Sequence, residues 1–359
     1  MPLIIKYLKK TWQGLCLSLV ACGLIATPLR AEPLKAKPWK PPVPPQARFA
    51  PDFEQDPAAW IQHLIQSDFY YPLQTACKPF YLPPQGTRKG TVLLFHGYSA
   101  CPQQFWELAP QLAARGFAVY VPVLPGHGRR SRQEAEKWID EPSDLPTEAS
   151  WRRYEEYAAQ IAQVMPKEGL RAVMGLSLGG AVAASALIQA PEQFDRGILG
   201  APLLDINPPS NYFLPPLSAL IPEYPAKWDD SCEVERAGGR GGYCQFRLRA
   251  LRGMQRLGQE TLVRLNEVKI PIQIVGVEKD GTASNTAQKE AAERLPQNQI
   301  CLFEKGANHS LLSRFDSPFE DKFWITPLNT MTLNFIEKGN YFETDGPAAE
   351  LGLMRCKAR

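Results

Sequence analysis

Residues 172–180 read AVMGLSLGG, and the segment that follows, to residue 189, is rich in alanine. The apolar run that ends at Leu176 predicts a buried strand, and residues 179–189 predict a helix. Ser177 therefore lies in a G-x-S-x-G pattern between a strand and a helix, where a strained turn holds the serine hydroxyl clear of the sheet. The pattern in this context predicts that Ser177 is a nucleophile; the alternative is a tight turn with an idle serine.

A serine hydroxyl is a weak nucleophile at its ordinary pKa, so it needs a base and a carboxylate that orients the base. In chains with this strand–turn–helix arrangement, the acid and the histidine follow the serine. The sequence contains 4 histidines, and His309 alone comes after Ser177. It follows a predicted short strand at 300–303, so we expect His309 to be the base.

Three acidic residues are candidates for the third member. The predicted strand at 270–277 is followed by Glu278 and Asp280, and we prefer Asp280 because it lies further into the loop. Glu278 stays an alternative. Asp205, which follows the predicted strand at 197–201, is the third candidate, because the acid can move by one strand in such folds.

Backbone N–H groups aimed at the negative oxygen of a tetrahedral intermediate supply a large part of the stabilisation in acyl transfer. One such donor is expected at Leu178, directly after the nucleophile. The other is expected at Tyr98, in the loop that follows a predicted strand at 91–95. His96 in the same loop is expected to be structural.

The rest of the chain alternates between strand-like and helix-like segments. Such alternation predicts an α/β fold with a mostly parallel sheet and helices on both faces. Thr326 is the expected N-cap of the last helix, with Pro327 in its first position. The expected strands are 91–95, 117–123, 172–176, 197–201, 270–277 and 300–303, and the expected helices are 58–67, 105–115, 151–165, 179–189 and 326–337.

Residues 203–266 interrupt this alternation and are too long for a plain loop. We interpret residues 205–266 as a cap over the carboxyl ends of the strands, where open α/β sheets bind ligands. Phe213, Leu214 and Leu217 are the candidate substrate-binding residues. The alternative is that they only pack the cap on the core.

The end of the cap has a helical pattern with two sides. The apolar side consists of Leu248, Leu251, Met254 and Leu257. The basic side, which we expect to be a solvated face, consists of Arg247, Arg249, Arg252 and Arg256.

The N-terminus is typical of an export signal, with three lysines before a short apolar run. Cleavage after Ala31 gives a signal peptide of residues 1–31. Alternatively, Leu19-Val20-Ala21-Cys22 resembles a lipoprotein box, with a signal to residue 21 and membrane attachment through a lipid on Cys22. An uncleaved anchor and a buried N-terminal helix are further alternatives.

Four further segments complete the predicted organisation. They are a Pro-rich extension at 32–89, a core at 90–204 and 267–340, and a C-terminal tail at 341–359.

Six cysteines remain after the signal, an even number that favours disulfides in an oxidising compartment. Cys232 and Cys244 flank a Gly-rich stretch, and we predict that they pair, which would stabilise the fold by about 3 kcal/mol. The cysteine spacings do not match zinc knuckles, and no metal site is expected. The alternative is a cytosolic protein with six free thiols.

Composition and charge indicate a globular chain and argue against a nucleic-acid-binding protein. Hydrophobic residues make up 44% and charged residues 21%, which is typical of a globular chain. The net charge of +3 includes 4 basic residues in the first 31, so the remainder has a net charge of −1. A nucleic-acid partner is therefore not expected, because it requires a basic footprint.

Three motifs in this order, HGYS at 96–99, LPGHG at 124–128 and GLSLGG at 175–180, resemble the α/β-hydrolase superfamily, together with Asp280 and His309. Within it they are similar to the bacterial carboxylesterase and monoacylglycerol-lipase group, over residues 90–205 and 268–338. The resemblance implies that Ser177, Asp280 and His309 form a catalytic triad and that Tyr98 and Leu178 donate to the oxyanion.

Two features differ from that group. The group often has Asp-x-Val-Val at the acid, whereas Gly281 follows Asp280 here, and the cap is longer than in its small esterases.

The sequence therefore predicts an exported serine hydrolase, periplasmic or secreted, that cleaves carboxylic esters, with a small-molecule ester or lipid as substrate and no cofactor. An acyltransferase with the same triad and a non-catalytic surface protein on a hydrolase fold are the alternatives. A peptidase is less favoured, because the chain has no propeller-sized extra domain.

Overall fold

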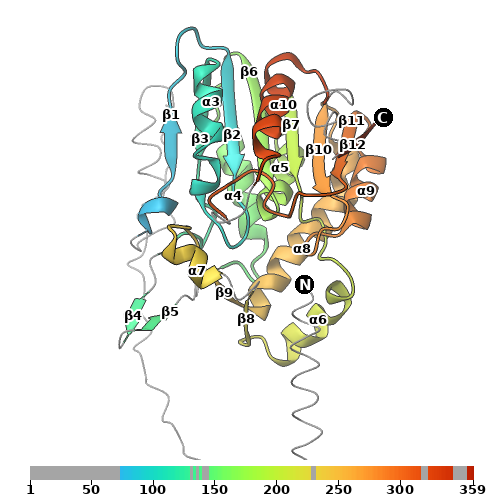
Figure 1. Ribbon diagram of the computed structural model, residues 1–359. Coiled ribbons are helices and arrows are strands. Elements are labelled where there is room, and N and C mark those ends of the chain that lie inside the picture. The colour runs from blue at the N-terminus through green and yellow to red at the C-terminus, as the bar shows by residue number, and fades with distance from the viewer. Residues whose placement is uncertain are drawn as a thin grey trace, which may run out of the picture.

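The computed structural model describes residues 73–359, apart from 130–131, 135–136, 140–144, 228–231, 317–321 and 343–353. The central element is an 8-stranded sheet with the strand order β1-β3-β2-β6-β7-β10-β11-β12 (Figure 1). The inner strands run parallel, and the two edge strands, β1 and β12, are antiparallel to their neighbours. The strands span Phe80–Leu82 (β1), Gly90–Phe95 (β2), Phe117–Val121 (β3), Leu170–Leu176 (β6), Arg196–Gly200 (β7), Ile272–Val277 (β10), Asn298–Phe303 (β11) and Met354–Ala358 (β12).

The inner strands are short apolar runs because helices cover both faces of the sheet. Every residue of β2, β3, β10 and β11 is buried. On one face lie α3 and α10, and on the other lie α4, α5, α8 and α9 (Figure 1). These helices span Leu108–Ala114 (α3), Arg152–Gln163 (α4), Leu178–Gln189 (α5), Leu248–Arg264 (α8), Asn285–Arg294 (α9) and Ile325–Lys338 (α10). The predicted α/β class, with a mostly parallel sheet, is confirmed.

Short 3-10 helices occur in the loops, and one of them takes the place of the start of the predicted helix at 105–115. That segment is divided into a 3-10 helix, Pro102–Phe105, and α3. Gly116, with φ +93°, ends α3 in the left-handed conformation that glycine adopts without a Cβ clash. The other 3-10 helices span Thr75–Cys77, Pro191–Gln193 and Leu265–Glu267.

Two edge strands and one helix extend the predicted core. β1 lies within the stretch expected to be an extension, and β12 lies within the expected tail. Both are short and partly exposed, so their sequences lack the apolar run of a central strand. The helix α9 was also not expected; Ser284 caps it by accepting a hydrogen bond from the Ala287 amide.

The N-cap prediction for the last helix is wrong. α10 begins at Ile325, with Trp324 at the N-cap position. The indole of Trp324 is buried and donates to the carbonyl of Leu311, which fixes an earlier start. The Thr326 hydroxyl instead accepts from Arg314. Pro327 is tolerated because it still lies in the first turn.

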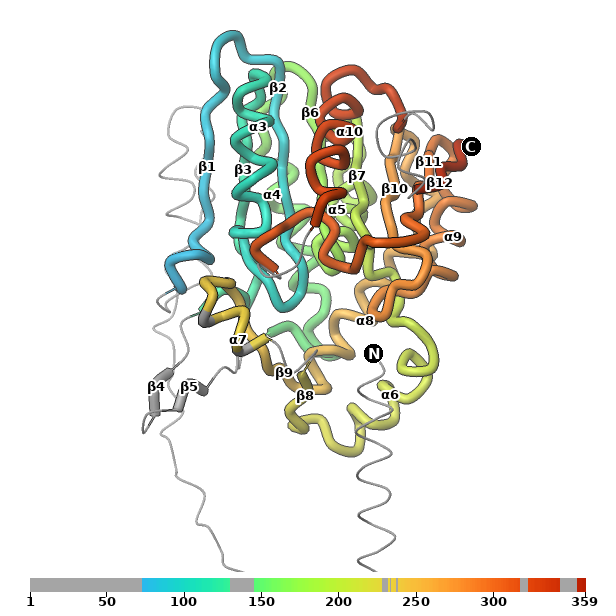
Figure 2. The backbone as a smooth tube through the Cα atoms, in the orientation of Figure 1, coloured from blue at the N-terminus to red at the C-terminus, as the bar shows by residue number. Residues whose placement is uncertain are grey.

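The cap elements gather beyond the carboxyl ends of the parallel strands (Figures 1 and 2). They are α6 (Ser210–Leu220), β8 (Pro225–Lys227), α7 (Cys232–Ala237) and β9 (Gln245–Arg247), and α8 then returns the chain to the core. Two further short strands, β4 (Arg132–Glu134) and β5 (Lys137–Ile139), form a separate hairpin.

The apolar side of α8 is buried as predicted, but the basic side is only partly solvated. Arg252 is 9% exposed. Its guanidinium donates to Gln255 and pairs with Glu148 at 3.0 Å. The expectation of a wholly solvated face is therefore wrong at Arg252, because these two partners compensate for its burial.

The predicted Cys232–Cys244 disulfide is present, together with Cys77–Cys101 and Cys301–Cys356. Three disulfides in the described residues are typical of a protein from an oxidising compartment. The predicted signal, the lipoprotein box, most of the Pro-rich extension and the helix at 58–67 lie outside the described residues. Within the part of the chain that is described, every helix is too short or too polar to cross a membrane.

Candidate active site

Ser177 sits on a strained turn between β6 and α5. Its backbone has φ 57° and ψ −117°, and a positive φ is rare for a residue with a side chain. Two glycines make this turn sterically feasible. A Cβ at Gly175 would lie 1.9 Å from the carbonyl oxygen of Gly179, and a Cβ at Gly179 would lie 2.0 Å from that of Phe95. The two glycines therefore allow the turn that places Ser177 at the end of β6.

Three side chains from separate loops meet at this edge. The Nε2 atom of His309 lies 2.8 Å from the Ser177 hydroxyl. The Nδ1 atom of His309 lies 2.7 Å from Oδ2 of Asp280. An ionised carboxylate can only accept, so Nδ1 carries the proton and Nε2 is left to accept from the serine.

Asp280 is held as a carboxylate. Its Oδ1 accepts from the amides of Thr282 and Ala283, at 2.7 and 3.0 Å. Burial favours the neutral acid, but His309 and these two amides outweigh burial and lower the pKa of Asp280. Conversely, burial disfavours the imidazolium of His309, but the charges of Asp280 and Asp316 outweigh burial, and the pKa of His309 is raised.

The other two acidic candidates lie elsewhere. Glu278 is exposed on its loop and pairs with Lys289 at 3.0 Å. Asp205 accepts from the Ile206 amide and from Gln255 of α8, so its carboxylate is engaged within residues 205–266. Of the three candidates, Asp280 is the one in contact with His309.

The two expected oxyanion donors lie in the segments that follow β6 and β2. Leu178 is the first residue of α5, and the amides of a first helical turn have no acceptor within the helix. Tyr98 lies in the loop at 97–101 that follows β2, hereafter called the oxyanion loop after this expected role. The side chain of Tyr98 is buried and packs edge-on against Tyr243 and Phe246 of the cap.

Two other histidines build the support beneath this loop. Nε2 of His96 accepts from the Leu124 amide at 3.0 Å, so Nδ1 must carry the proton, and it donates to the Gly97 carbonyl at 2.8 Å. His127 is fully buried beside it, with ring centroids 5.2 Å apart. Burial lowers the pKa of both rings, that of His127 to about 4, so both are neutral at pH 7.

Comparison with solved structures adds to this geometry. A monoacylglycerol lipase from Paleococcus ferrophilus matches with a TM-score of 0.55 and 17% identity, over 73% of this chain and 99% of that one. A soluble variant of monoglyceride lipase from Saccharomyces cerevisiae, in complex with a substrate analogue, matches with a TM-score of 0.54 and 16% identity, over 73% and 92%. A structure described with LipS and LipT, two metagenome-derived lipolytic enzymes, matches with a TM-score of 0.54 and 18% identity, over 74% and 100%.

At the level of sequence, the model of a family described as "Serine aminopeptidase, S33" matches residues 86–235. The fold of the chain is that of the lipase structures it matches, which is the α/β-hydrolase fold. No curated protein sequence matches the chain. At these identities, the likeness to the solved structures concerns the fold.

The cap residues singled out from the sequence differ in exposure. All three lie on α6. Leu214 is buried, whereas Phe213 is 54% exposed. Leu217 is half-buried against the core.

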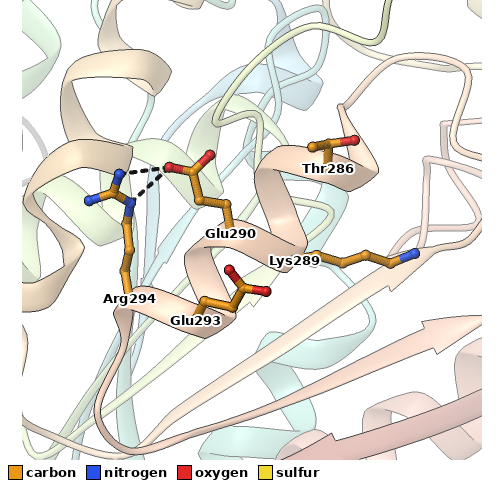
Figure 3. Close-up of a pocket in the computed structure, with 5 residues that line it drawn as sticks. All are labelled: Thr286, Lys289, Glu290, Glu293 and Arg294. Atoms are coloured by element: carbon orange, nitrogen blue, oxygen red, sulfur yellow. Dashed lines mark hydrogen bonds and ion pairs between the residues drawn. The ribbon is translucent and has the colours of Figure 1, made fainter.

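A surface pocket lies on α9, and its lining is polar (Figure 3). Thr286, Lys289 and Glu293 are exposed, and Glu290 pairs with Arg294 at 2.7 Å, one helical turn away. None of these side chains belongs to the site around Ser177. Among the described residues, no group of three or more His, Cys, Asp and Glu side chains could hold a metal ion.

The sequence carries no motif signal for two buried residues next to the site, Gln104 and Asp316. Gln104 lies in the 3-10 helix after the oxyanion loop, and Asp316 lies seven residues after His309. Their side chains are hydrogen-bonded to each other. Only the three-dimensional arrangement brings them together.

Proposed function

We propose that this protein is an exported serine hydrolase that cleaves carboxylic esters through an acyl-enzyme. One observation carries the proposal: Asp280, His309 and Ser177 form a continuous hydrogen-bonded line, and Ser177 occupies a strained turn at the start of a helix. A neighbouring base and a buried carboxylate are what a serine needs to act as a nucleophile.

The reaction follows from the positions of these groups. Ser177 Oγ attacks the acyl carbonyl while His309 Nε2 takes its proton, and Asp280 stabilises the imidazolium. The amides of Tyr98 and Leu178 donate to the negative oxygen. His309 then protonates the leaving alcohol, and the acyl group stays on Ser177. Water, deprotonated by His309, releases the acid and regenerates the serine.

The cap, residues 205–266, is the proposed source of substrate selection. Phe213, Leu214 and Leu217 supply apolar surface on α6, and apolar side chains line most small-molecule pockets. We therefore propose an ester with an apolar acyl chain, such as a lipid, as the substrate class.

Export is proposed from the first 31 residues and is supported by the three disulfides. Attachment through a lipid on Cys22 is the alternative to a free periplasmic or secreted protein. Mass determination of the mature N-terminus distinguishes the two forms.

The proposal is tested with p-nitrophenyl esters of increasing acyl chain length and with a fluorophosphonate probe. Ser177→Ala should lower kcat by about 10⁴-fold or more and should abolish labelling. Ser185→Ala is the matched control, because Ser185 is a buried serine of α5, the helix that follows Ser177, and its hydroxyl has no hydrogen-bond partner among the described residues. It should keep wild-type activity.

Three results would contradict the proposal. Equal rates for Ser177→Ala and the wild type would remove the nucleophile. Faster cleavage of aminoacyl p-nitroanilides than of esters would indicate an aminopeptidase. Acyl transfer to an added alcohol with no released acid would indicate an acyltransferase.

A further inference from the structure

We propose that the buried pair Gln104 and Asp316 positions the oxyanion loop relative to the loop that carries His309. The inference rests on the proposed function, since it concerns the Tyr98 amide as a donor to the oxyanion. Both residues act through other groups and do not contact the reacting atoms, so they are positioning residues.

The hydrogen bonds define the orientation of the Gln104 amide. Its Oε1 accepts from the Gly97 N–H at 2.7 Å, and its Nε2 donates to the Asp316 carboxylate. A backbone N–H can only donate, so this orientation of the amide is fixed. Gln104 is 4% exposed and Asp316 is 7% exposed, so little solvent competes for these bonds.

The Gly97 backbone controls the Tyr98 amide directly. A peptide unit is planar and trans, so the Tyr98 N–H points opposite to the Gly97 carbonyl. That carbonyl accepts from Nδ1 of His96 at 2.8 Å and from the Ala100 amide at 3.3 Å. Gln104 holds the preceding N–H of the same residue, and together these bonds set the direction in which the Tyr98 N–H points.

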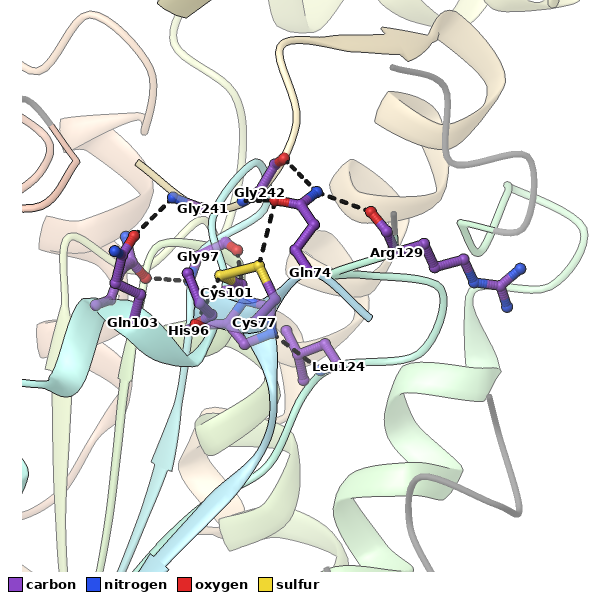
Figure 4. The surroundings of a disulfide bond; sticks show 12 residues. Gln74, Cys77, His96, Gly97, Cys101, Gln103, Leu124, Arg129, Gly241 and Gly242 are labelled. Atoms are coloured by element: carbon purple, nitrogen blue, oxygen red, sulfur yellow. Dashed lines mark hydrogen bonds between the residues drawn. A yellow bond between two sulfur atoms is a disulfide. The ribbon is translucent and has the colours of Figure 1, made fainter. Parts of the chain in front are cut away.

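The far end of the oxyanion loop is fixed covalently. Cys101 is bonded to Cys77, and this disulfide lies beside His96 and Gly97 (Figure 4). The loop therefore stays folded without Gln104, and the loss of the amide affects mainly the end that carries Tyr98. Removal of Gln104 should thus change alignment more than stability.

Asp316 connects this arrangement to the base. It belongs to the loop that follows His309, and its negative charge adds to that of Asp280 in favouring the imidazolium. One carboxylate therefore receives the Gln104 amide and acts electrostatically on His309. A purely structural role for Asp316 would not involve the protonation of His309.

A second link between the same segments provides the control. Glu107 pairs with Arg314, and this pair is more exposed, at 25% and 41%. It joins the helical segment after the oxyanion loop to the loop after His309, but it makes no contact with Gly97 in the described hydrogen bonds. Glu107→Gln is therefore matched in location without reaching the Tyr98 amide.

The experiment uses Gln104→Met, Asp316→Asn and Glu107→Gln, with a p-nitrophenyl ester that the wild type hydrolyses. Gln104→Met keeps the side-chain size and removes both hydrogen bonds. It should lower kcat by about 10²-fold with KM within about threefold, because one misaligned oxyanion donor costs about that much. Glu107→Gln should retain wild-type kinetics.

Asp316→Asn keeps an acceptor oxygen for Gln104 and removes the charge. It should move the acid limb of the kcat/KM profile to lower pH, with kcat on the plateau within about threefold. Thermal unfolding is measured for each variant.

The proposal is overturned if Gln104→Met is folded and has wild-type kcat, or if both variants lose thermal stability while kcat and the acid limb stay unchanged. If Gln104→Met does not fold, the acid limb of Asp316→Asn decides. Failure of the proposed function is distinguishable, because the wild type itself would then hydrolyse no ester.

Discussion

Ser177, Asp280 and His309 show how individual side chains obtain their protonation states. The carboxylate is fully buried but accepts three hydrogen bonds, so it remains ionised. The imidazole is 23% exposed and faces that carboxylate. The pKa of Asp280 is lowered and the pKa of His309 is raised, because each residue stabilises the charged form of the other.

A bell-shaped or sigmoidal pH–rate profile should report on His309. In the proposed mechanism His309 must be neutral to accept the serine proton, and its pKa is raised above the ordinary value of 6.5. Activity should therefore rise with pH through an apparent pKa above 6.5. The profile of kcat/KM against pH measures it. An acid limb centred below 6 would contradict the charge assigned to Asp280.

Among the structural elements, β12 is held to its neighbour by a covalent link. It is an edge strand whose side chains are mostly exposed, and it pairs antiparallel with β11. Cys356 lies directly opposite Cys301 in that register and is bonded to it. The disulfide therefore fixes the last strand of the sheet, which has little buried apolar surface of its own.

Removal of that link should destabilise the protein more than removal of the cap disulfide. The Cys301–Cys356 disulfide closes 55 residues of chain, and the lost entropy raises the free energy of the unfolded state by about 4 kcal/mol. The Cys232–Cys244 disulfide closes 12 residues and raises it by about 3 kcal/mol. The comparison is between Cys301→Ala/Cys356→Ala and Cys232→Ala/Cys244→Ala, by urea unfolding without reductant. An equal or smaller loss for the first variant would show that chain restriction does not govern the effect.

The folded protein as a whole holds two neutral histidines in its interior. His96 and His127 link the loops that follow β2 and β3, and both have lowered pKa values. The unfolded chain binds protons at these residues near pH 6.5, whereas the folded chain does not. Proton uptake therefore favours unfolding as the pH falls.

The free energy of unfolding should decrease between pH 6.5 and pH 4. The pKa of His127 is 6.5 in the unfolded chain and about 4 in the folded protein, so the free energy of unfolding decreases by about 3 kcal/mol across that window. His309 acts in the opposite direction, because its raised pKa stabilises the fold at low pH and that contribution is lost as the pH rises. Urea unfolding at pH 7 and pH 5 measures the balance. His127→Gln should flatten the dependence, and an unchanged slope in that variant would exclude His127 as its source.

Local pattern in the sequence determined the strand–turn–helix at Ser177, the alternation of strands and helices, and His309 as the one histidine after the serine. These features depend on residues close together in the chain and on steric limits that hold in any fold. The parallel sheet follows from the same pattern, since apolar strands must be covered by the helices between them.

Tertiary structure alone decided which of three carboxylates contacts His309. It also decided how the four cysteines other than Cys232 and Cys244 pair, and that β1 and β12 complete the sheet. It also brought Gln104 to Gly97 and Asp316. Each of these depends on the distance between segments that are far apart in the chain. Such distances are set by packing of the entire core, and no short stretch of residues encodes them.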